Sequence, residues 1–368
     1  MIIRKFTSLF KDITGGNVKV KKSEYLTYGN HPVIDQGKGL IGGYSDLNRT
    51  VNRKGEVIVF GDHTGCLKFV DFDFLLGADG VKVIQPNYDE VDTKYAYYLL
   101  HKVHIPDTGY DRKFKYLKRT EIPIPPLATQ KKIAAILDAA DAHRQKTKQL
   151  LAKYDELAQS IFLEMFGDPV TNPKGWEVKK MGEVLELITY GLTVRPKYHK
   201  TGVPLISAKE IRSGYLDMEN AARISKTDFD SLSQKGRPNK GDILFSKTGS
   251  IGHCALVENQ ELFAITQNAA RLVFNKSVYR KYAIYYLRSD YVQNLSKRLA
   301  KGNAVKDLQL GDMREIKFLM PPENLQSEFE EIVNSVEAQK EILNQEIISS
   351  ENLFNSLLQI AFKGELVS

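Results

Sequence analysis

The chain has 368 residues, of which 42% are hydrophobic and 26% charged, and its 52 Lys and Arg against 45 Asp and Glu give a formal net charge of +7. This composition is ordinary for a folded soluble protein, the length suffices for two or three domains, and the modest basic excess favours a polyanionic partner without requiring one. A leader-like N-terminal segment is absent, as is any apolar run near the roughly 18–20 residues that span a bilayer, so we expect a cytoplasmic protein that contacts no membrane.

Residues 1–124 are predicted to form a first globule. Short β-type runs at 56–60, 67–70 and 81–84 are separated by Gly and Asn/Asp clusters, as turns require. A helical stripe predicts one helix over 93–102. Basic and aromatic side chains of this globule are candidates for contacts with DNA: Lys19, Lys21, Lys22, Arg112, Lys113, Lys115 and Tyr116.

Residues 125–168 are predicted to contain a long helix over 130–166, because two prolines precede it and a glycine follows it. Apolar residues at three- and four-residue steps indicate coiled-coil character. The predicted seam includes Ile133, Ile136, Leu150, Leu157 and Ile161. At about 1.5 Å per residue the helix spans roughly 55 Å, longer than the ~34–36 Å of one turn of B-DNA.

Residues 169–320 repeat the plan of the first globule. The segment Lys281–Tyr286 matches Lys94–Leu99, and strands are predicted at 203–206, 242–245 and 270–274. Loops of unequal length separate the matched elements, as in two modules that read different sequences. Its candidates for DNA contact are Arg195, Lys197, Tyr198, Lys209, Lys247, Thr248, Lys301, Asn303 and Lys306.

Residues 321–368 are predicted to form a second long helix over 326–362, a gap-free copy of the first (326 − 130 = 196 and 362 − 166 = 196). Its apolar stripe includes Phe329, Ile332, Leu343, Leu353 and Leu357. The predicted fold is α+β: two similar mixed α/β globules separated by two long helices that pack as an antiparallel coiled coil with an internal pseudo-two-fold. An internal dimer suits a two-fold target such as duplex DNA with two half-sites.

Motifs for catalysis are mostly missing, and we expect no catalytic residues and no metal in this chain. The GxGxxG of Gly37–Gly42 is followed by a second turn signal, and the P-loop-like stretch Gly241–Thr248 lacks the second glycine. The Asn/Asp-Pro-Pro-aromatic loop that holds a flipped base in amino-methyltransferases has no match. Two cysteines, Cys66 and Cys254, are interpreted as small core residues, with a disulfide as the alternative.

The pattern resembles the specificity subunit of type I restriction–modification systems over nearly the whole chain. The most specific pieces are Glu121–Leu127 followed by Gln130, and Phe166-Gly167-Asp168, while Gly175-Trp176-Glu177 looks like the opening of a second target-recognition domain. In the first globule, Lys5–Leu9 stands where that tryptophan opening is expected. The resemblance implies target-recognition domains at 1–124 and 169–320 and conserved helical spacers at 125–168 and 321–368.

The same resemblance implies a non-catalytic subunit that reads a bipartite, asymmetric site on double-stranded DNA. Two modification subunits would supply an S-adenosylmethionine-dependent adenine-N6 methyltransferase, and two restriction subunits would add translocation and cleavage driven by ATP with Mg. This chain would need no cofactor of its own. Three alternatives stay open: a type II-like or related defence system with the same modules, an adaptor that binds proteins rather than DNA, and a fused methyltransferase or nuclease.

Overall fold

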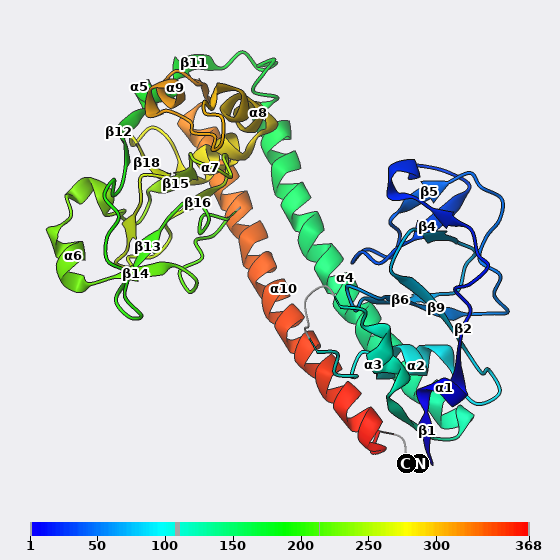
Figure 1. Cartoon of the computed structure of the whole chain (residues 1–368). Coiled ribbons are helices and arrows are strands. Elements are labelled where there is room, and N and C mark those ends of the chain that lie inside the picture. Colours follow the sequence, from blue (N-terminus) through cyan, green and yellow to red (C-terminus); the bar gives the residue numbers. More distant parts are fainter. Residues whose placement is uncertain (1, 107–110, 213, 367–368) are drawn as a thin grey trace. The chain divides into compact units, whose positions relative to one another are not determined.

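The computed structural model describes residues 2–106, 111–212 and 214–366, which belong to two compact units (Figure 1). Unit 1 comprises residues 1–149 and 344–368, and unit 2 comprises residues 150–343. Each unit contains one globule and a part of each of two long helices, α4 (Leu127–Phe166) and α10 (Glu323–Lys363). Among the described residues, no helix is long and apolar enough to cross a bilayer.

The globule of unit 1 is built on two four-stranded sheets. The first has the antiparallel order β2-β9-β6-β7, and β6 (Val57–Gly61) lies inside it as a fully buried apolar strand. The second has the order β3-β8-β4-β5, with β8 parallel to both β3 and β4. The remaining strands of these sheets are β2 (Phe10–Asp12), β3 (Lys19–Val20), β4 (His31–Ile34), β5 (Gly43–Ser45), β7 (Leu67–Val70), β8 (Leu75–Gly77) and β9 (Val81–Pro86).

Helices and a separate strand pair connect this globule to α4. The pair β1 (Ile2–Lys5) and β10 (Glu121–Ile124) is antiparallel and leads directly into the long helix. Helix α2 (Thr93–Leu100) is capped by the preceding Asp92, whose carboxylate accepts the Tyr95 N–H at 2.9 Å. The other helices are α1 (Phe6–Leu9), η1 (Lys22–Glu24) and α3 (Phe114–Lys118).

Unit 2 repeats this topology. Its four-stranded sheet has the order β12-β18-β15-β16, which matches β2-β9-β6-β7, and the pair β11/β19 matches β1/β10. In the three-stranded sheet β14-β13-β17, β13 and β17 are parallel, like β4 and β8. The strands are β11 (Glu177–Lys180), β12 (Leu185–Tyr190), β13 (Val203–Ile206), β14 (Ala222–Ile224), β15 (Ile243–Ser246), β16 (Cys254–Leu256), β17 (Ala264–Ile265), β18 (Ala269–Phe274) and β19 (Lys317–Met320). The helices are α5 (Met181–Val184), α6 (Lys226–Ser231), η2 (Gln234–Gly236), α7 (Arg280–Arg288), α8 (Asp290–Leu299) and α9 (Leu310–Arg314).

The duplication extends to single hydrogen bonds. Gln130 and Gln326, 196 positions apart, are both fully buried at the start of their helices. The Gln130 amide accepts the Asp92 N–H and donates to the carbonyls of Glu90 and Pro125. The Gln326 amide accepts the Tyr279 N–H and donates to the carbonyls of Ser277 and Pro321. The prediction that the two globules share one fold is therefore confirmed, and so is the predicted α+β class.

The two long helices run antiparallel and pair within each unit (Figure 1). In unit 1, Arg144 lies 3.3 Å from Glu351, and Lys148 lies 2.6 Å from the same carboxylate. In unit 2, Lys340 pairs with Asp155. Because Lys340 and Asp155 are the 196-residue equivalents of Arg144 and Glu351, the ion pairs are duplicated together with the helices.

The buried stripe of the helices differs from the predicted seam. Ile133, Phe329 and Leu343 are buried as expected, and Ile161, Ile332 and Leu357 are partly buried. The placement of the other four residues in the seam is wrong, because their side chains are exposed: Ile136, Leu150, Leu157 and Leu353. Each helix half packs against its globule as well as the other helix, which shifts the buried positions. The residues buried instead include Leu137, Phe162, Phe166, Val333, Phe354 and Leu358.

Most predicted elements of the globules exist, with small changes of boundary. The strands at 67–70 and 203–206 are confirmed as β7 and β13, and the helix predicted over 93–102 ends at Leu100. The second sheet of unit 1, strands β14 and β17 of unit 2, and helix α8 were not predicted. Most of these strands are only two or three residues long, whereas the helical apolar pattern of α8 (Tyr291, Val292, Leu295 and Leu299) was not recognised. Cys254 is buried and Cys66 partly buried, and both thiols are free.

Candidate nucleic-acid interface

In unit 1, one group of candidate cations begins in β3 and continues into the segment that follows it. Lys19, Lys21 and Lys22 are all exposed, and the short helix η1 is closed by a 3.1 Å hydrogen bond from the Lys21 N–H to the Glu24 carboxylate. The neighbouring Tyr28 is 85% exposed. Cations beside an exposed aromatic ring can neutralise phosphates and stack on or pack against bases.

The second group of unit 1 lies around α3. Arg112 and Lys115 are exposed, and Lys113 and Tyr116 are partly buried. The Lys115 ammonium lies 2.5 Å from the Asp111 carboxylate, a hydrogen bond that raises the pKa of Lys115. It also lies 5.1 Å from the centre of the Tyr116 ring. This ion pair is exposed and adds little stability, so Lys115 can exchange Asp111 for a phosphate at low cost.

The segment between β12 and β13 gives unit 2 a counterpart of the first group. Arg195, Lys197 and Tyr198 are exposed, and the Arg195 guanidinium lies 5.2 Å from the centre of the Tyr198 ring. This segment occupies the same place in the topology as residues 21–30. In unit 2, His199 near the end of this segment forms an antiparallel β-bridge with Arg223 of β14. In unit 1, Leu26 forms the corresponding antiparallel β-bridge with Tyr44 of β5. Both units therefore present cations and aromatic rings from the same part of the fold.

Lys209 follows β13 and extends into solvent. Its ammonium lies 3.2 Å from the carboxylate of Glu210, which is itself buried. Glu210 accepts hydrogen bonds from the Ser207 N–H at 3.0 Å and the Ser207 hydroxyl at 2.6 Å, so it holds the turn after the strand. The turn presents Lys209 from a fixed backbone.

The structure places Lys247 and Thr248 differently from the sequence-based expectation. Lys247 is only 7% exposed, and its ammonium is paired with the Asp307 carboxylate, to which the Thr248 hydroxyl also donates. A cation at the buried end of β15 needs a counter-charge, and Asp307 supplies it. These two residues therefore hold the segment around Asp307 instead of presenting their own polar groups to solvent.

Lys301, Asn303 and Lys306 are brought together on that same segment. The N–H of Lys301 donates to the Asp307 carbonyl at 2.9 Å, and the Asp307 N–H donates back at 2.8 Å. These two bonds close a hairpin, here called the 301–307 hairpin, whose residues 301–306 are all exposed. The hairpin therefore places three of the candidate residues on one short, closed backbone loop.

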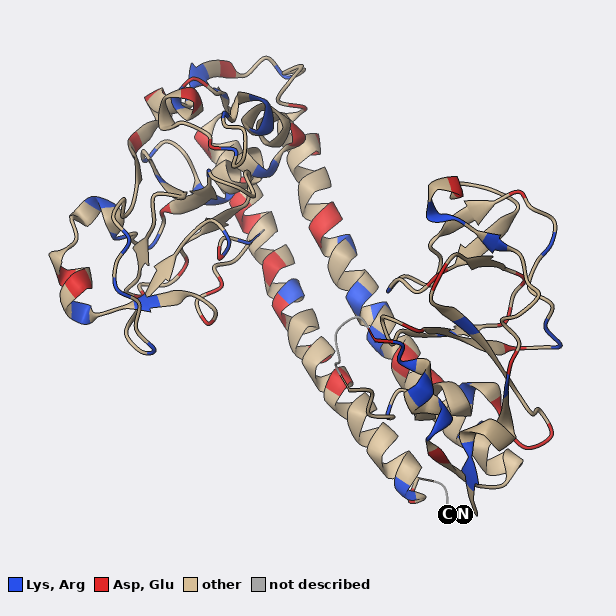
Figure 2. Cartoon of the chain, viewed as in Figure 1, with Lys and Arg blue, Asp and Glu red and all other residues tan. Residues whose placement is uncertain are grey.

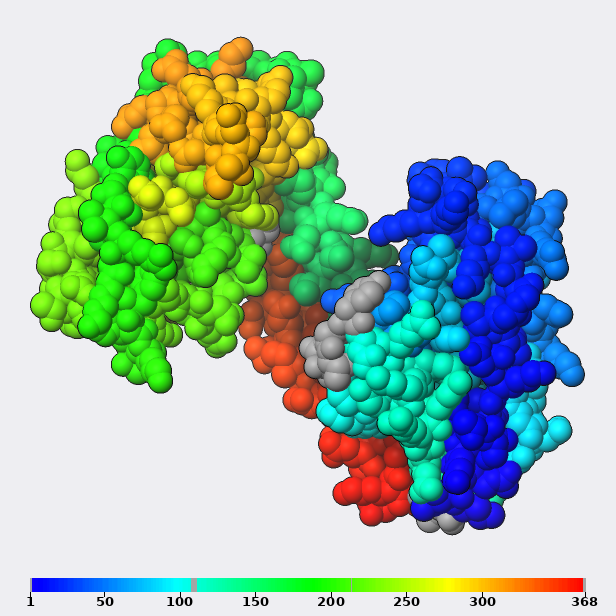
Figure 3. All heavy atoms as spheres, viewed as in Figure 1, coloured from blue at the N-terminus to red at the C-terminus, as the bar shows by residue number. Residues whose placement is uncertain are grey.

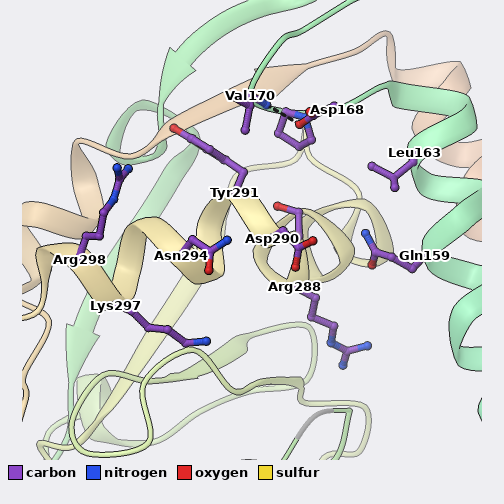
Figure 4. A pocket seen from close by; sticks show the side chains of 12 residues that line it. Gln159, Leu163, Asp168, Val170, Arg288, Asp290, Tyr291, Asn294, Lys297 and Arg298 are labelled. Atoms are coloured by element: carbon purple, nitrogen blue, oxygen red, sulfur yellow. Dashed lines mark hydrogen bonds between the residues drawn. The ribbon is translucent and has the colours of Figure 1, made fainter. Parts of the chain in front are cut away.

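Sequence reasoning missed a hollow of about 980 Å³ within unit 2, between the end of α4 and helix α8 (Figure 4). Figure 4 shows Lys297 and Arg298 of α8 on its wall. Three cations against two carboxylates line it, which favours an anionic ligand. Its lining residues are Gln159, Leu163, Asp168, Pro169, Val170, Arg288, Ser289, Asp290, Tyr291, Asn294, Lys297 and Arg298. In the sequence, the features that could have indicated this hollow are the basic pair Lys297-Arg298 and the Phe166-Gly167-Asp168 motif.

Lys and Arg are distributed over both units rather than concentrated in one (Figure 2). On unit 2, the gold to orange atoms of the segment that includes α8 form a continuous part of the visible surface (Figure 3). The candidate residues therefore lie on several separate segments of each globule.

A family profile described as "Type I restriction modification DNA specificity domain" matches residues 4–153 and 173–351. The chain belongs to this family. The two matched segments each cover one globule and most of the long helix that follows it, as the internal duplication requires. The resemblance inferred from the sequence is confirmed.

Individual members of this specificity family are also similar to the chain in sequence. The chain is 24% identical over 283 residues to the type I restriction enzyme EcoBI specificity subunit of Escherichia coli, covering 68% of this chain and 60% of the relative. It is 27% identical over 188 residues to the putative type I restriction enzyme MjaX specificity subunit of Methanocaldococcus jannaschii, covering 47% of this chain and 43% of the relative. The matches thus span about half of these relatives' lengths.

Solved structures of the family share the fold. The S subunit of a type I restriction–modification system from M. genitalium aligns with a TM-score of 0.59 and 18% identity, covering 98% of this chain and 96% of that one. A second structure, from work on complex assembly and conformational transition of the type I R-M system, aligns with a TM-score of 0.57 and 18% identity, covering 99% of this chain and 98% of that one.

Proposed function

We propose that this chain is the sequence-recognition subunit of a type I restriction–modification system and reads a bipartite, asymmetric site on duplex DNA. The observation that carries the proposal is the pair of family matches over two globules of the same topology. Each globule presents cations and aromatic rings from corresponding loops, which differ in sequence. Two equivalent frames with different loops suit two unlike half-sites.

In this proposal the chain performs no catalysis and acts in the cytoplasm, where its DNA lies. Two modification subunits dock on it and bring the S-adenosylmethionine-dependent adenine-N6 methyltransferase. Two restriction subunits add ATP- and Mg-dependent translocation and cleavage. The exposed apolar side chains of α4 and α10 (Ile136, Leu150, Leu157 and Leu353) support a docking role for the long helices.

The test is binding and methylation by the full chain co-expressed with the modification subunit encoded beside it. We expect a single bipartite motif with methylated adenines in the host genome, and duplex affinity that falls steeply as salt rises. A chain that binds proteins but no duplex DNA at low salt would instead be an adaptor. Methyl transfer by the purified chain alone would indicate a fused enzyme. A type II-like system is indicated if the same methylated motif is kept when the neighbouring subunits are replaced by different catalytic partners.

A further inference from the structure

The 301–307 hairpin has the form of a rigid finger. Its two main-chain bonds between Lys301 and Asp307 join the ends, and buried Ala300 and Leu308 flank them. Gly302 has φ +121°, and a Cβ at this position would lie 2.2 Å from the Val305 carbonyl oxygen. A glycine is therefore required for the turn to close this tightly.

The base of the hairpin is fixed to the end of β15. The Gly249 N–H donates to the Lys306 carbonyl at 2.9 Å, and the Leu308 N–H donates to the Lys247 carbonyl at 2.8 Å. The Asp307 carboxylate accepts from Lys247, Thr248 and Gln309. Because Asp307 is enclosed by these donors, its negative charge is neutralised at the base, below the tip.

Unit 1 uses the corresponding anchor. Asp62 follows β6 as Lys247 follows β15, and it is equally buried, at 5% exposure. Its carbonyl accepts the Lys113 N–H at 2.7 Å, and its carboxylate accepts the Phe114 N–H at 2.8 Å. The residue after the central strand thus fixes the segment that precedes α3 in unit 1 and α9 in unit 2. Its side chain is negatively charged in unit 1 and positively charged in unit 2.

The exposed tip has the chemistry that reads a base pair. It carries cations at Lys301 and Lys306, an amide at Asn303 and a 59% exposed apolar side chain at Val305, with no acidic residue between 301 and 306. The Lys301 side chain is exposed, and its ammonium lies 3.1 Å from the partly buried carboxylate of Asp312. An asparagine amide pairs with both N6 and N7 of adenine in the major groove, and an apolar side chain contacts the thymine methyl group.

We propose that the 301–307 hairpin is the base-reading finger of unit 2, with Asn303 recognising an adenine edge and Asp307 positioning the finger. This inference rests on the proposed DNA-recognition function. Lys306 and Lys301 contact the flanking phosphates and fix the register. A preformed hairpin loses little conformational entropy on binding, so its contacts favour affinity and discrimination.

The decisive experiment selects duplexes from a randomised library with the full chain in complex with its modification subunit. Wild type is compared with Asn303→Ala, Lys306→Ala and the control Lys174→Ala, an exposed lysine in the turn after α4. We expect Asn303→Ala to lose roughly 5- to 150-fold of discrimination at one or two adjacent A·T pairs of one half-site only. Lys306→Ala should weaken all sequences alike and lower the salt slope by about 1.

Asp307→Asn tests the positioning residue. It should lower the ratio of cognate to random-duplex affinity, again through the same half-site, while circular dichroism shows an intact fold. If this variant does not fold, the Asn303→Ala variant, whose substitution is at an exposed position, still tests the finger assignment. Unchanged preferences in Asn303→Ala, with normal binding, would overturn the finger assignment and leave the proposed function standing. Absence of any sequence preference in wild type would overturn both.

Discussion

The buried amide of Gln130 allows a direct test of how each globule is fixed to its long helix. Its oxygen accepts the Asp92 N–H at 2.9 Å, and its nitrogen donates to the carbonyls of Glu90 at 2.8 Å and Pro125 at 2.9 Å. Gln130→Leu fills a similar volume but leaves one N–H and two carbonyls without partners. We therefore expect a lower free energy of unfolding for unit 1.

The expected loss of unfolding free energy follows from the number of polar groups that lose their hydrogen-bond partner. Each buried group without a partner costs about 1–3 kcal/mol. The partner residues of Gln130 are only partly buried, so water can reach some of these groups, and such costs do not simply add. We expect Gln130→Leu to cost about 2–4 kcal/mol, a large fraction of the ~5–15 kcal/mol of a typical domain.

The assay is urea unfolding followed by circular dichroism, with hydrogen exchange of the Asp92 amide as the local readout. Gln149, an exposed glutamine of the same helix, provides the matched control, and Gln149→Leu should stay within about 0.5 kcal/mol of wild type. If Gln130→Leu changed the free energy of unfolding as little as this control does, the reasoning would be refuted. Gln326→Leu should behave similarly in unit 2, since its bonds match, although the one to Ser277 is longer at 3.3 Å.

Three further outcomes are expected. Tyr95→Phe and Tyr282→Phe each remove a hydroxyl that donates to a β10 or β19 carbonyl (2.9 and 2.8 Å), so urea titrations should show matched losses of about 1 kcal/mol, and unequal losses would contradict the equivalence of the units. The hydrogen bond from Lys148, with Arg144 nearby, lowers the pKa of Glu351 below its ordinary value of 4.5, so its contribution is present above that value and is lost as pH falls through the lowered pKa. Glu351→Gln should therefore destabilise unit 1 more at pH 7 than at acidic pH below 4.5 in thermal unfolding; an equal effect at both would exclude this pairing. Exchanging residues 1–124 for those of a relative should replace one half of the methylated motif, read by sequencing of methylated adenines, and a change in both halves would refute the modular reading.

The long helices could be predicted because their signals are local and strong. Prolines before and glycines after each one, together with the constant offset of 196 residues, predicted helices over 130–166 and 326–362, and the structure extends them only to Leu127–Phe166 and Glu323–Lys363. The globule topology could be matched for the same reason, since repeated short motifs identify corresponding elements even where loops differ.

Side-chain roles could not be predicted, because they depend on what packs against each residue. Lys247 looks like a surface cation in the sequence, yet Asp307, 60 residues later, holds it below the surface. Ile136 and Leu157 fit a helical stripe, but the globules bury neighbouring faces instead. Gln130 and Gln326 were visible as identical positions, and only the structure identifies the backbone groups that they bind.

The division of the chain into units has a consequence for biosynthesis. Unit 2 is one uninterrupted stretch, whereas the core of unit 1 also includes Phe354, Leu358 and Ala361 from the end of α10. During translation, unit 2 can complete its core as soon as residue 343 has left the ribosome. Unit 1, although synthesised first, must wait for the last helical turns, so its apolar surface on α4 stays open to chaperones or assembly partners until then.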